Sequence, residues 1–455
     1  MRIMIFGGTV VNPAGKSGQY DILIDDGKVV AMEPATDKRS FDQKPGQKNS
    51  SGAKTSSEWL WLSPDEVIDA SGMIVAPGLV DAHVHFRDPG QTHKEDIFTG
   101  AEAAKTGGYT SVVMMANTAP PIDNVEILKY VLDRGAQTDI NIYACANVTL
   151  GMKGEELTDM VALVEAGAVG FTDDGKPIKD VEIVKAAMQK AKELGVPISF
   201  HEEDPQYIQT PGFNASKVVS VGLGLEGAEA KAEYSMISRD AKLAAETGAS
   251  IVIQHISTAE GVEIVRHYRK LGHNNIHAEA TPHHFTLTEY DAIEKGTLAK
   301  MNPPLRTKAD CQRIQEGIMS GCIELISTDH APHAIEEKNQ ELAKAPSGVI
   351  GLETALGVTL NQLDTGPKSR RLNRLANIIE HMSVNPAKIY GLDAGVIRDG
   401  GKADIVIFDP DEPWVVDDRF ASKAKNSPFI GETMIGKVKY TICDGTIIYR
   451  DKCNC

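Results

Sequence analysis

The feature that most constrains the fold is a regular alternation along the middle of the chain. Between about residues 76 and 390, short apolar runs that end in polar or charged residues alternate with amphipathic stretches. Buried parallel strands are typically continuous apolar runs, and the helices that cover them carry one apolar face. The runs predict eight strands: Ile74–His85, Thr110–Asn117, Asn141–Asn147, Ala168–Asp174, Pro197–His201, Ser250–Ser257, Ile276–His284 and Glu324–His330.

The stretches between these runs have the spacing of helices that pack on a sheet. Eight strand–helix repeats predict a (β/α)8 barrel of the TIM type over residues 76–390, with its chemistry at the C-terminal ends of the strands. A doubly wound open sheet is the alternative, but no G-x-G-x-x-G follows an early strand, which disfavours a dinucleotide site. The helix-like segments are Glu155–Ala166, Val181–Leu194, Ala228–Thr247, Ala259–Leu271 and Lys308–Ser320.

The two ends of the chain share a different, strand-rich pattern. Short apolar runs separated by turn sequences such as Asn12-Pro13-Ala14-Gly15 begin the chain, and similar runs recur at Ala403–Phe408 and Lys437–Ile442. We therefore expect residues 1–75 plus 391–455 to form one β-sandwich-like domain beside the catalytic barrel, 76–390. Within it, Thr36–Ser57 is almost free of apolar residues, which predicts a mobile insertion (36–57).

Composition excludes several classes of function. Lys+Arg total 47 and Asp+Glu total 63, a net charge of −16, which argues against nonspecific binding to nucleic acid or to an anionic membrane. No stretch approaches the roughly 18 apolar residues that span a bilayer. The six cysteines are mostly isolated in apolar runs, as at Cys145 and Cys322, and do not form a disulfide framework. We expect a cytoplasmic protein with a small-molecule substrate and with no nucleic-acid or membrane partner.

Histidines gather at the predicted strand ends. Residues two apart in an extended strand share a face, so His83 and His85 can bind one ion. Together with His201, His255 and Asp329 at later strand ends, they form the N/O ligand set that a hydrolytic metal site requires. Of the 13 histidines, those at or just after strand ends are His83, His85, His201, His255, His283, His284, His330 and His333.

Six motifs make the chain similar to the amidohydrolase superfamily, and within it to the class I, bacterial-type dihydroorotases. The H-x-H-x-R-x-P-G run and the D-H-A-P-H run are highly specific together. The resemblance covers essentially the whole chain outside the insertion. The motifs are Asp81–Gly90, Met115–Thr118, Gly170–Gly175, Thr281–His284, Met301–Arg306 and Ile326–His333.

This resemblance implies two metal ions per subunit. His83, His85 and Asp329 would hold one ion, His201 and His255 the second, and Asp174 and a hydroxide would bridge them. Zn2+ is the expected ion, although Mn and Co suit similar ligands.

The fourth strand leaves the identity of the bridging ligand open. Many relatives bridge the metals with a carboxylated lysine, whereas this chain has Phe171-Thr172-Asp173-Asp174. Alternation lets only one aspartate face the axis, and the class pattern favours Asp174. Asp173 as the ligand, and a carboxylated Lys176, remain alternatives.

The resemblance implies a dihydroorotase, which interconverts N-carbamoyl-L-aspartate and (S)-dihydroorotate plus water in pyrimidine (UMP) biosynthesis. Two cations that share a water lower its pKa toward neutrality. Asp329 would be the catalytic residue that takes the proton of this water and delivers it to the leaving nitrogen.

A second set of residues is assigned to the substrate by the resemblance. Arg87 can offer a bidentate fork to a carboxylate, and its alternative role is an ion pair with Asp88 or Glu95. Asn117 and Asn302 could instead be turn formers. The substrate-binding residues implied are Arg87, Asn117, Asn302, His333, Ser347 and Gly348.

Three further expectations concern the surroundings of this site. One of His283 and His284 would support the metal ligands, without an indication of which. Lys94–Asp96 and Glu229–Glu233 are expected to be solvated helix faces. The charged segment His333–Pro346 is expected to be a lid over the site.

Two competing functions remain. A hydantoinase or allantoinase would carry a lysine within Thr172–Asp174 and would usually lack the Arg87-x-Pro89-Gly90 arrangement. A catalytically dead subunit that scaffolds aspartate transcarbamoylase should have lost metal ligands, and none is missing. The family resemblance also implies a homodimer and leaves association with aspartate transcarbamoylase open.

Overall fold

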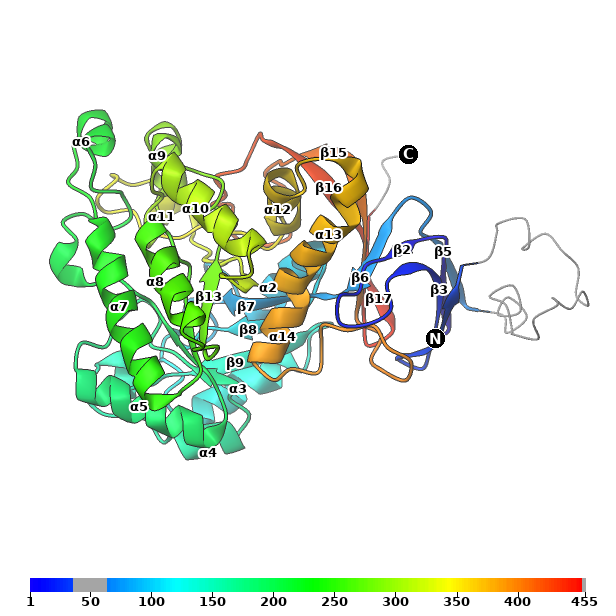
Figure 1. Cartoon of the computed structure of the whole chain (residues 1–455), viewed down its shortest axis with the longest axis horizontal. Helices are drawn as coiled ribbons and strands as arrows, with labels where there is room; N and C mark the ends of the chain where they lie inside the picture. The colour runs from blue at the N-terminus through cyan, green and yellow to red at the C-terminus, as the bar shows by residue number, and fades with distance from the viewer. Residues whose placement is uncertain (36–63, 452–455) are drawn as a thin grey trace, which may run out of the picture.

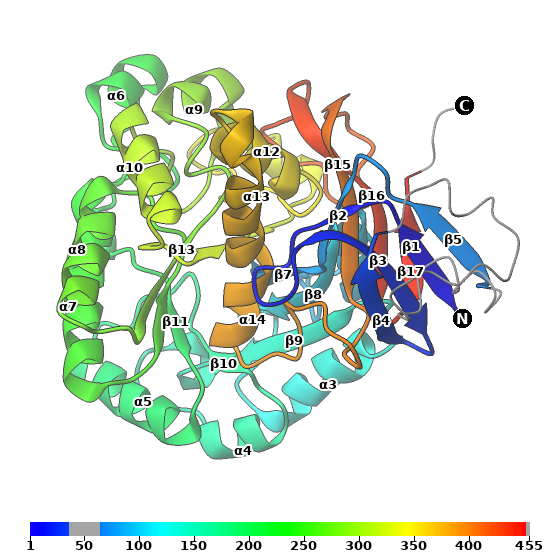
Figure 2. The same ribbon diagram turned by 45° about the vertical axis from the view of Figure 1, so that its right-hand side comes forward.

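Two β-sheets organise the chain, an eight-stranded parallel sheet and a nine-stranded mixed sheet. The computed structural model describes residues 1–35 and 64–451. Figures 1 and 2 show the helix-covered parallel sheet on one side and the strands of the chain ends on the other. The predicted mobile insertion, 36–57, lies outside the described residues. No described helix is both long and apolar enough to cross a membrane.

The parallel sheet closes into the predicted (β/α)8 barrel. Its strands are neighbours in chain order, from β7 to β14. A parallel bridge between Val84 and His330 joins the first strand to the last, and the His85 amide donates to the His330 carbonyl at 2.9 Å. The strands are β7 (Leu79–Val84), β8 (Tyr109–Met114), β9 (Asn141–Ala146), β10 (Gly170–Phe171), β11 (Ile198–Phe200), β12 (Ile251–Ile253), β13 (Ile276–Ala280) and β14 (Leu325–Ile326).

Helices cover the outside of this barrel, and α5 shows why the sequence forms them. Asp180 caps its N-terminus by accepting hydrogen bonds from two backbone amides, and Gly195, with φ of 72°, ends it. Val184, Ala187 and Met188 recur on one face and are buried. The helices are α2 (Ile97–Thr106), α3 (Val125–Gly135), α4 (Met160–Glu165), α5 (Val181–Leu194), α6 (Lys217–Leu223), α7 (Ala230–Thr247), α8 (Ala259–Lys270), α9 (Glu289–Lys295), α10 (Lys308–Met319), α11 (Ile335–Lys338), α12 (Ala355–Leu363), α13 (Arg371–Ile379) and α14 (Asn385–Ile389).

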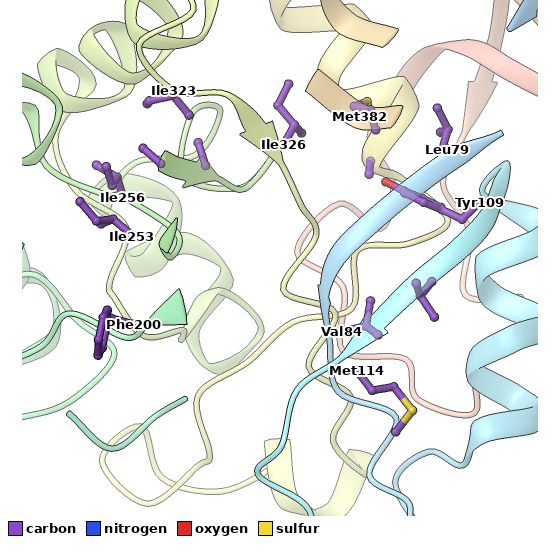
Figure 3. Close-up of a cluster of buried hydrophobic side chains, with 14 of the residues drawn as sticks. Leu79, Val84, Tyr109, Met114, Phe200, Ile253, Ile256, Ile323, Ile326 and Met382 are labelled. Carbon is purple, nitrogen blue, oxygen red and sulfur yellow. The ribbon is translucent and has the colours of Figure 1, made fainter. Parts of the chain in front are cut away.

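The main core lies between the barrel strands and their helices. In Figure 3, Leu79 of β7 and Tyr109 of β8 lie near Met382, which belongs to the helical segment before α14. Each of these three side chains is fully buried. Burial of apolar area stabilises the fold by about 25 cal/mol per Å2, so this core fixes the frame from which the polar strand ends project.

The mixed sheet is built from both ends of the chain and has a core of its own. Its strand order is β17-β16-β15-β6-β2-β3-β1-β5, and β4 pairs with β3. Buried side chains from both halves of this sheet form one cluster, which includes Ile5, Ile22 and Ile405. The strands are β1 (Ile3–Phe6), β2 (Thr9–Val10), β3 (Gly18–Asp25), β4 (Lys28–Pro34), β5 (Glu66–Asp69), β6 (Ile74–Pro77), β15 (Ile405–Val415), β16 (Thr433–Cys443) and β17 (Thr446–Arg450).

One predicted strand is in fact two. The run Ile74–His85 divides at Gly78, so β6 pairs with β15 in the mixed sheet while β7 begins the barrel. The Gly78 amide donates to the Asp404 carbonyl, and a Cβ at this position would overlap the Thr110 side chain. The prediction of one strand was wrong because hydrophobicity is continuous across this change of sheet.

Candidate metal centre

The six side chains predicted as metal ligands converge at one mouth of the barrel. They lie at or after the C-terminal ends of β7, β10, β11, β12 and β14, the end where barrel enzymes carry their chemistry. None is more than 8% exposed. The six are His83, His85, Asp174, His201, His255 and Asp329.

Backbone strain also concentrates at this mouth. Within residues 1–35 and 64–451, six residues other than glycine have positive φ, and three of them are predicted site residues. These are Arg87 (φ 58°), His255 (φ 32°) and Asp329 (φ 47°). Residues other than glycine rarely adopt a positive φ. Such a backbone conformation persists where the surrounding structure imposes it, commonly at functional sites.

The first ligand group joins β7 to the strand that closes the barrel. Asp329 Oδ1 lies 3.0 Å from His85 Nε2 and 3.5 Å from His83 Nε2. Asp174 Oδ2 lies 3.5 Å from His85 Nε2. These atoms therefore face one shared position between the two histidines and the two carboxylates.

The second ligand group lies on the other side of Asp174. Its two histidines are 3.0 Å apart, from His201 Nδ1 to His255 Nε2. Asp174 Oδ1 is 3.5 Å from His201 Nδ1 and 4.0 Å from His255 Nε2. The carboxylate of Asp174 thus contributes one oxygen to each group, as a bridging ligand must.

The donor atoms fit metal ions. Two ligands at about 2.1 Å from one tetrahedral ion lie roughly 3.4 Å apart, close to the separations found here. His83 Nε2 is buried without a hydrogen-bond partner, although its surroundings are polar. Such an atom is costly unless a ligand or ion completes it. Two sets of three donors, His83–Asp174–His255 and His83–His85–Asp329, each lie within 4.8 Å of one another.

The pKa values of the clustered histidines and carboxylates are shifted because these buried groups lie close together. Burial favours the neutral form of His83, yet Glu279, Asp329 and Asp174 outweigh it and hold the pKa of His83 well above its usual range. Burial likewise opposes ionisation of Asp174, but the nearby His201 and His83 rings keep its pKa well below normal. The pKa of His255 falls well below normal through burial and then through His201. Bound cations would supply the charge that these carboxylates attract.

The geometry separates the two adjacent aspartates that follow the fourth barrel strand, which ends at Phe171. Asp173 turns away from the axis and accepts hydrogen bonds from the amides of Val148 (2.9 Å) and Thr149 (3.2 Å) and from the Thr149 hydroxyl. Asp174 faces the histidines. This arrangement favours Asp174 over Asp173 as the metal ligand. Lys176 is exposed, whereas the six candidate ligands are all buried.

Carboxylates that sequence reasoning did not single out hold the histidine rings from behind. Glu279 of β13 lies 2.9 Å from His83 Nδ1, and its carboxylate also accepts the His255 amide at 3.2 Å. Glu203 lies 3.2 Å from His201 Nε2. Such partners fix the tautomer and orientation of a ligating ring. The available signal was Glu279 itself, a carboxylate inside an apolar strand.

Replacing Glu279 with glutamine should therefore weaken metal binding. The neutral amide accepts a hydrogen bond from His83 Nδ1 more weakly than the carboxylate does, so it orients the ring less firmly. We therefore expect metal affinity to fall roughly 10- to 100-fold. Competition with a coloured chelator measures this affinity directly. Glu182→Gln, on the first turn of α5, is a matched control outside the site. Equal affinities in the two variants would contradict the role given to Glu279.

Two acidic positions expected to be solvated are in fact buried. Glu95 is 0% exposed and contacts the Ser422 hydroxyl and His330, the latter at 3.5 Å. Glu233 is 2% exposed and accepts the Ser257 and Thr258 amides. That prediction was wrong because carboxylates can cap buried loop amides. The spacing of Glu233 from Ile237, four residues on, does place it on the buried face of α7.

Arg87 keeps its guanidinium free of carboxylate partners among the described residues. Its Nε donates to the Pro332 carbonyl at 3.3 Å. The two alternative partners are engaged elsewhere: Asp88 pairs with Arg134 at 2.9 Å, and Glu95 with the Ser422 region. The geometry therefore favours a ligand-facing Arg87 over a structural ion pair.

The two predicted asparagines differ in what they contact. The Asn117 side chain lies between His85 Nδ1, at 2.9 Å, and Asp174 Oδ2, to which it donates at 2.8 Å. It thus links two metal-ligand candidates. The side-chain oxygen of Asn302 is buried and has no hydrogen-bond partner, which leaves it available to a ligand.

His333, Ser347 and Gly348 form one connected group. His333 Nε2 donates to the Ser347 carbonyl at 2.8 Å, and the Gly348 amide donates to the Lys300 carbonyl at 2.9 Å. Burial lowers the pKa of His333 to about 2, with Arg87 and Lys94 adding to the effect. The cations Arg87, Lys94 and Lys338 thus surround a neutral His333, and the Glu337 carboxylate lies 3.5 Å from its Nδ1.

The adjacent histidines after β13 also separate. His284 contacts the Thr281 hydroxyl at 2.7 Å and donates to the Pro303 carbonyl at 2.8 Å, so it braces the loop that carries Asn302. His283 Nε2 is buried without a hydrogen-bond partner. His283 is therefore the one of the two with a nitrogen still to be satisfied.

Comparison with known proteins agrees with this geometry. The model of the amidohydrolase family matches residues 74–448. The dihydroorotases of Clostridioides difficile (strain 630) and Clostridium acetobutylicum are 49% and 47% identical, over 98% and 99% of this chain and 99% and 100% of theirs. The solved L-hydantoinase (dihydropyrimidinase) of Arthrobacter aurescens superposes with a TM-score of 0.81 at 25% identity, covering 98% of this chain and 96% of that one. The chain therefore belongs to the amidohydrolase family, in its dihydroorotase branch.

Proposed function

We propose that this chain is a metal-dependent dihydroorotase, which opens (S)-dihydroorotate to N-carbamoyl-L-aspartate and closes it again with loss of water. The observation that carries the proposal is a combination of two features at the same barrel mouth. One is the histidine cluster around Asp174, and the other is Arg87, which has no carboxylate partner among the described residues. The relatives that share almost half of its residues over the full chain support the same reaction.

The residues of the chain divide the chemistry between them. The histidine and aspartate cluster would hold metal ions, which would lower the pKa of a water molecule and polarise the ring amide carbonyl. Asp329, whose carboxylate faces the same position, accepts the proton of the attacking water and delivers it to the leaving ring nitrogen. Asn117 fixes the positions of His85 and Asp174 relative to each other through its two hydrogen bonds.

The charge of the pocket suits a carboxylate-bearing ring. Arg87, Lys94 and Lys338 all lie close enough to His333 to lower its pKa, and Glu337 is the carboxylate that pairs with Lys94, at 3.3 Å. The carboxylate that does not react would be bound by the Arg87 fork. Asn302, His333 and the Ser347–Gly348 backbone would complete the substrate contacts.

The first experiment is a steady-state assay of the purified chain with metal. Loss of the ring-amide absorbance of L-dihydroorotate reports ring opening, and hydantoin and allantoin are assayed in parallel. We expect turnover of dihydroorotate to exceed that of the other two. Faster turnover of hydantoin or allantoin would overturn the assignment, and a chain with no bound metal and no activity on any ring would favour a scaffold role.

An Arg87→Met variant should bind the substrate poorly while still turning it over. The loss of one charged, bidentate contact raises KM roughly 10- to 100-fold. Arg87→Lys keeps the charge but loses the bidentate guanidinium, so its KM should lie between those of Arg87→Met and the parent. Steady-state KM and kcat measure both. A fall in metal content in Arg87→Met would instead indicate a structural role.

Finer properties follow from the family resemblance and are part of the proposal. We propose two Zn2+ ions per subunit, a cytoplasmic homodimer and a place in de novo pyrimidine biosynthesis. The described cysteines are free and buried, in keeping with a reducing compartment. Metal analysis tests the identity and number of ions. Sedimentation of the chain alone and with aspartate transcarbamoylase tests the dimer and any association between the two enzymes.

A further inference from the structure

Two buried lysines hold the loop that carries Ser347 and Gly348. Lys338 ends α11 and is 0% exposed. Its Nζ donates to the carbonyls of Pro346 at 2.9 Å, Gly348 at 3.0 Å and Lys300 at 3.4 Å. In the part of the chain that the structure describes, no carboxylate forms an ion pair with Lys338. Its charge is therefore compensated by carbonyl dipoles alone.

Burying an ammonium group in this way carries a free-energy cost. Removal of a cation from water is unfavourable unless nearby groups replace its hydration. Burial, with a smaller contribution from the Lys300 charge, lowers the pKa of Lys338 to about 7. A surface lysine would avoid this cost, as Lys344 does six residues later with its side chain 67% exposed. The buried position of Lys338 is consistent with a role beyond solubility.

Lys300 extends the same network toward Asn302. Its Nζ donates to the carbonyls of Leu342 at 2.8 Å and Ala343 at 3.2 Å. Its own carbonyl accepts the Gly348 amide at 2.9 Å as well as Lys338 Nζ. The two lysines thus tie the backbone of 342–348 to the strand-end loop that precedes Asn302.

The far side of this loop contacts the proposed substrate pocket. The Ser347 carbonyl accepts from His333 Nε2 at 2.8 Å. Asn426 Nδ2 donates to the carbonyls of Gly348 at 3.0 Å and Ala331 at 3.1 Å. None of the atoms that Lys338 holds belongs to a candidate metal ligand. A substitution of Lys338 should therefore weaken substrate binding and leave metal binding unchanged.

We propose that Lys338 is a positioning residue, which fixes the Pro346–Gly348 backbone and, through Ser347, the His333 ring at the substrate side of the site. Its kinetic consequence rests on the proposed dihydroorotase function. The hydrogen bonds by which Lys338 holds the Pro346–Gly348 backbone, called the loop clamp below, do not depend on that function. It predicts that loss of the ammonium weakens substrate binding while metal binding and the chemical step persist.

The test compares Lys338→Met with Lys344→Met, its surface control on the same segment. Methionine keeps most of the buried volume and removes the three hydrogen bonds. We expect KM for dihydroorotate to rise about tenfold or more, with kcat within about threefold and metal content unchanged. Hydrogen exchange followed by mass spectrometry should show faster exchange in residues 339–352 of Lys338→Met, and parental exchange in Lys344→Met.

The outcomes are decisive in each case. An unchanged KM in a folded Lys338→Met variant overturns the proposal, as does a loss of metal or of kcat at constant KM. If Lys338→Met does not fold, Lys300→Met decides, because it loses the Leu342 and Ala343 bonds: a raised KM supports the clamp and a parental KM overturns it. If the parent chain is inactive on dihydroorotate, the proposed function is wrong. If hydrogen exchange in residues 339–352 is unchanged in Lys338→Met, the loop clamp is wrong, whatever the function.

Discussion

Replacing Asp329 with asparagine should lower kcat for dihydroorotate by roughly 10^3-fold, within the range of about 10^2 to 10^4 that a positioned general base contributes. The amide cannot accept a proton, so the attacking water loses its base and the leaving nitrogen its acid. The side chain remains isosteric, which limits structural disturbance. Steady-state kinetics on the metal-loaded variant, with metal content measured on the same sample, give the result.

Metal content distinguishes the two roles assigned to Asp329. Its oxygen lies 3.0 Å from His85 Nε2, so the variant also tests a ligand position. A near-parental metal content with the expected loss of kcat identifies proton transfer as the main role. Activity within about tenfold of the parent would contradict the assignment of Asp329 as the general base.

The barrel was predictable because its signal is local and repeated. Helices such as α5 and α8 carry their own N-cap side chain and apolar face, and α8 (Ala259–Lys270) ends one residue short of the expected Leu271. The junction at Gly78 was not predictable in this way. A continuous apolar run does not indicate where the chain passes from one sheet to the other. The Thr110 side chain, which leaves no room for a Cβ at position 78, is not a sequence neighbour of Gly78.

The convergence of the candidate ligands was predictable because the C-terminal ends of parallel barrel strands meet at one mouth, but the residues that support their rings were not. Nothing near His83 in sequence indicates that Glu279 holds its ring, since the pair forms only when β7 and β13 share a barrel. The same holds for Lys338, which lies in the charged segment His333–Pro346 that the sequence predicts to be a lid. Long-range burial, not local composition, decides whether such a charge faces solvent or carbonyl groups.

The adjacent pair Asp173 and Asp174 offers the sharpest separation of metal binding from stability. Asp174→Ala removes the carboxylate shared by both histidine groups, so we expect loss of bound metal and a fall in activity of roughly 10^3-fold. Asp173→Ala leaves that carboxylate in place. It instead strands the buried Val148 and Thr149 amides, which should lower the free energy of unfolding by on the order of 3 kcal/mol.

Denaturant unfolding and metal analysis of the two variants, each measured below its unfolding transition, test this contrast. Opposite signatures one residue apart follow from the geometry just after β10, where Asp174 faces the histidines and Asp173 accepts the amides of Val148 and Thr149. If Asp173→Ala lost the metal while Asp174→Ala retained it, the bridging assignment would have to be reversed. If both lost stability alone, neither aspartate would be a ligand, and the cluster would need its bridge from another residue.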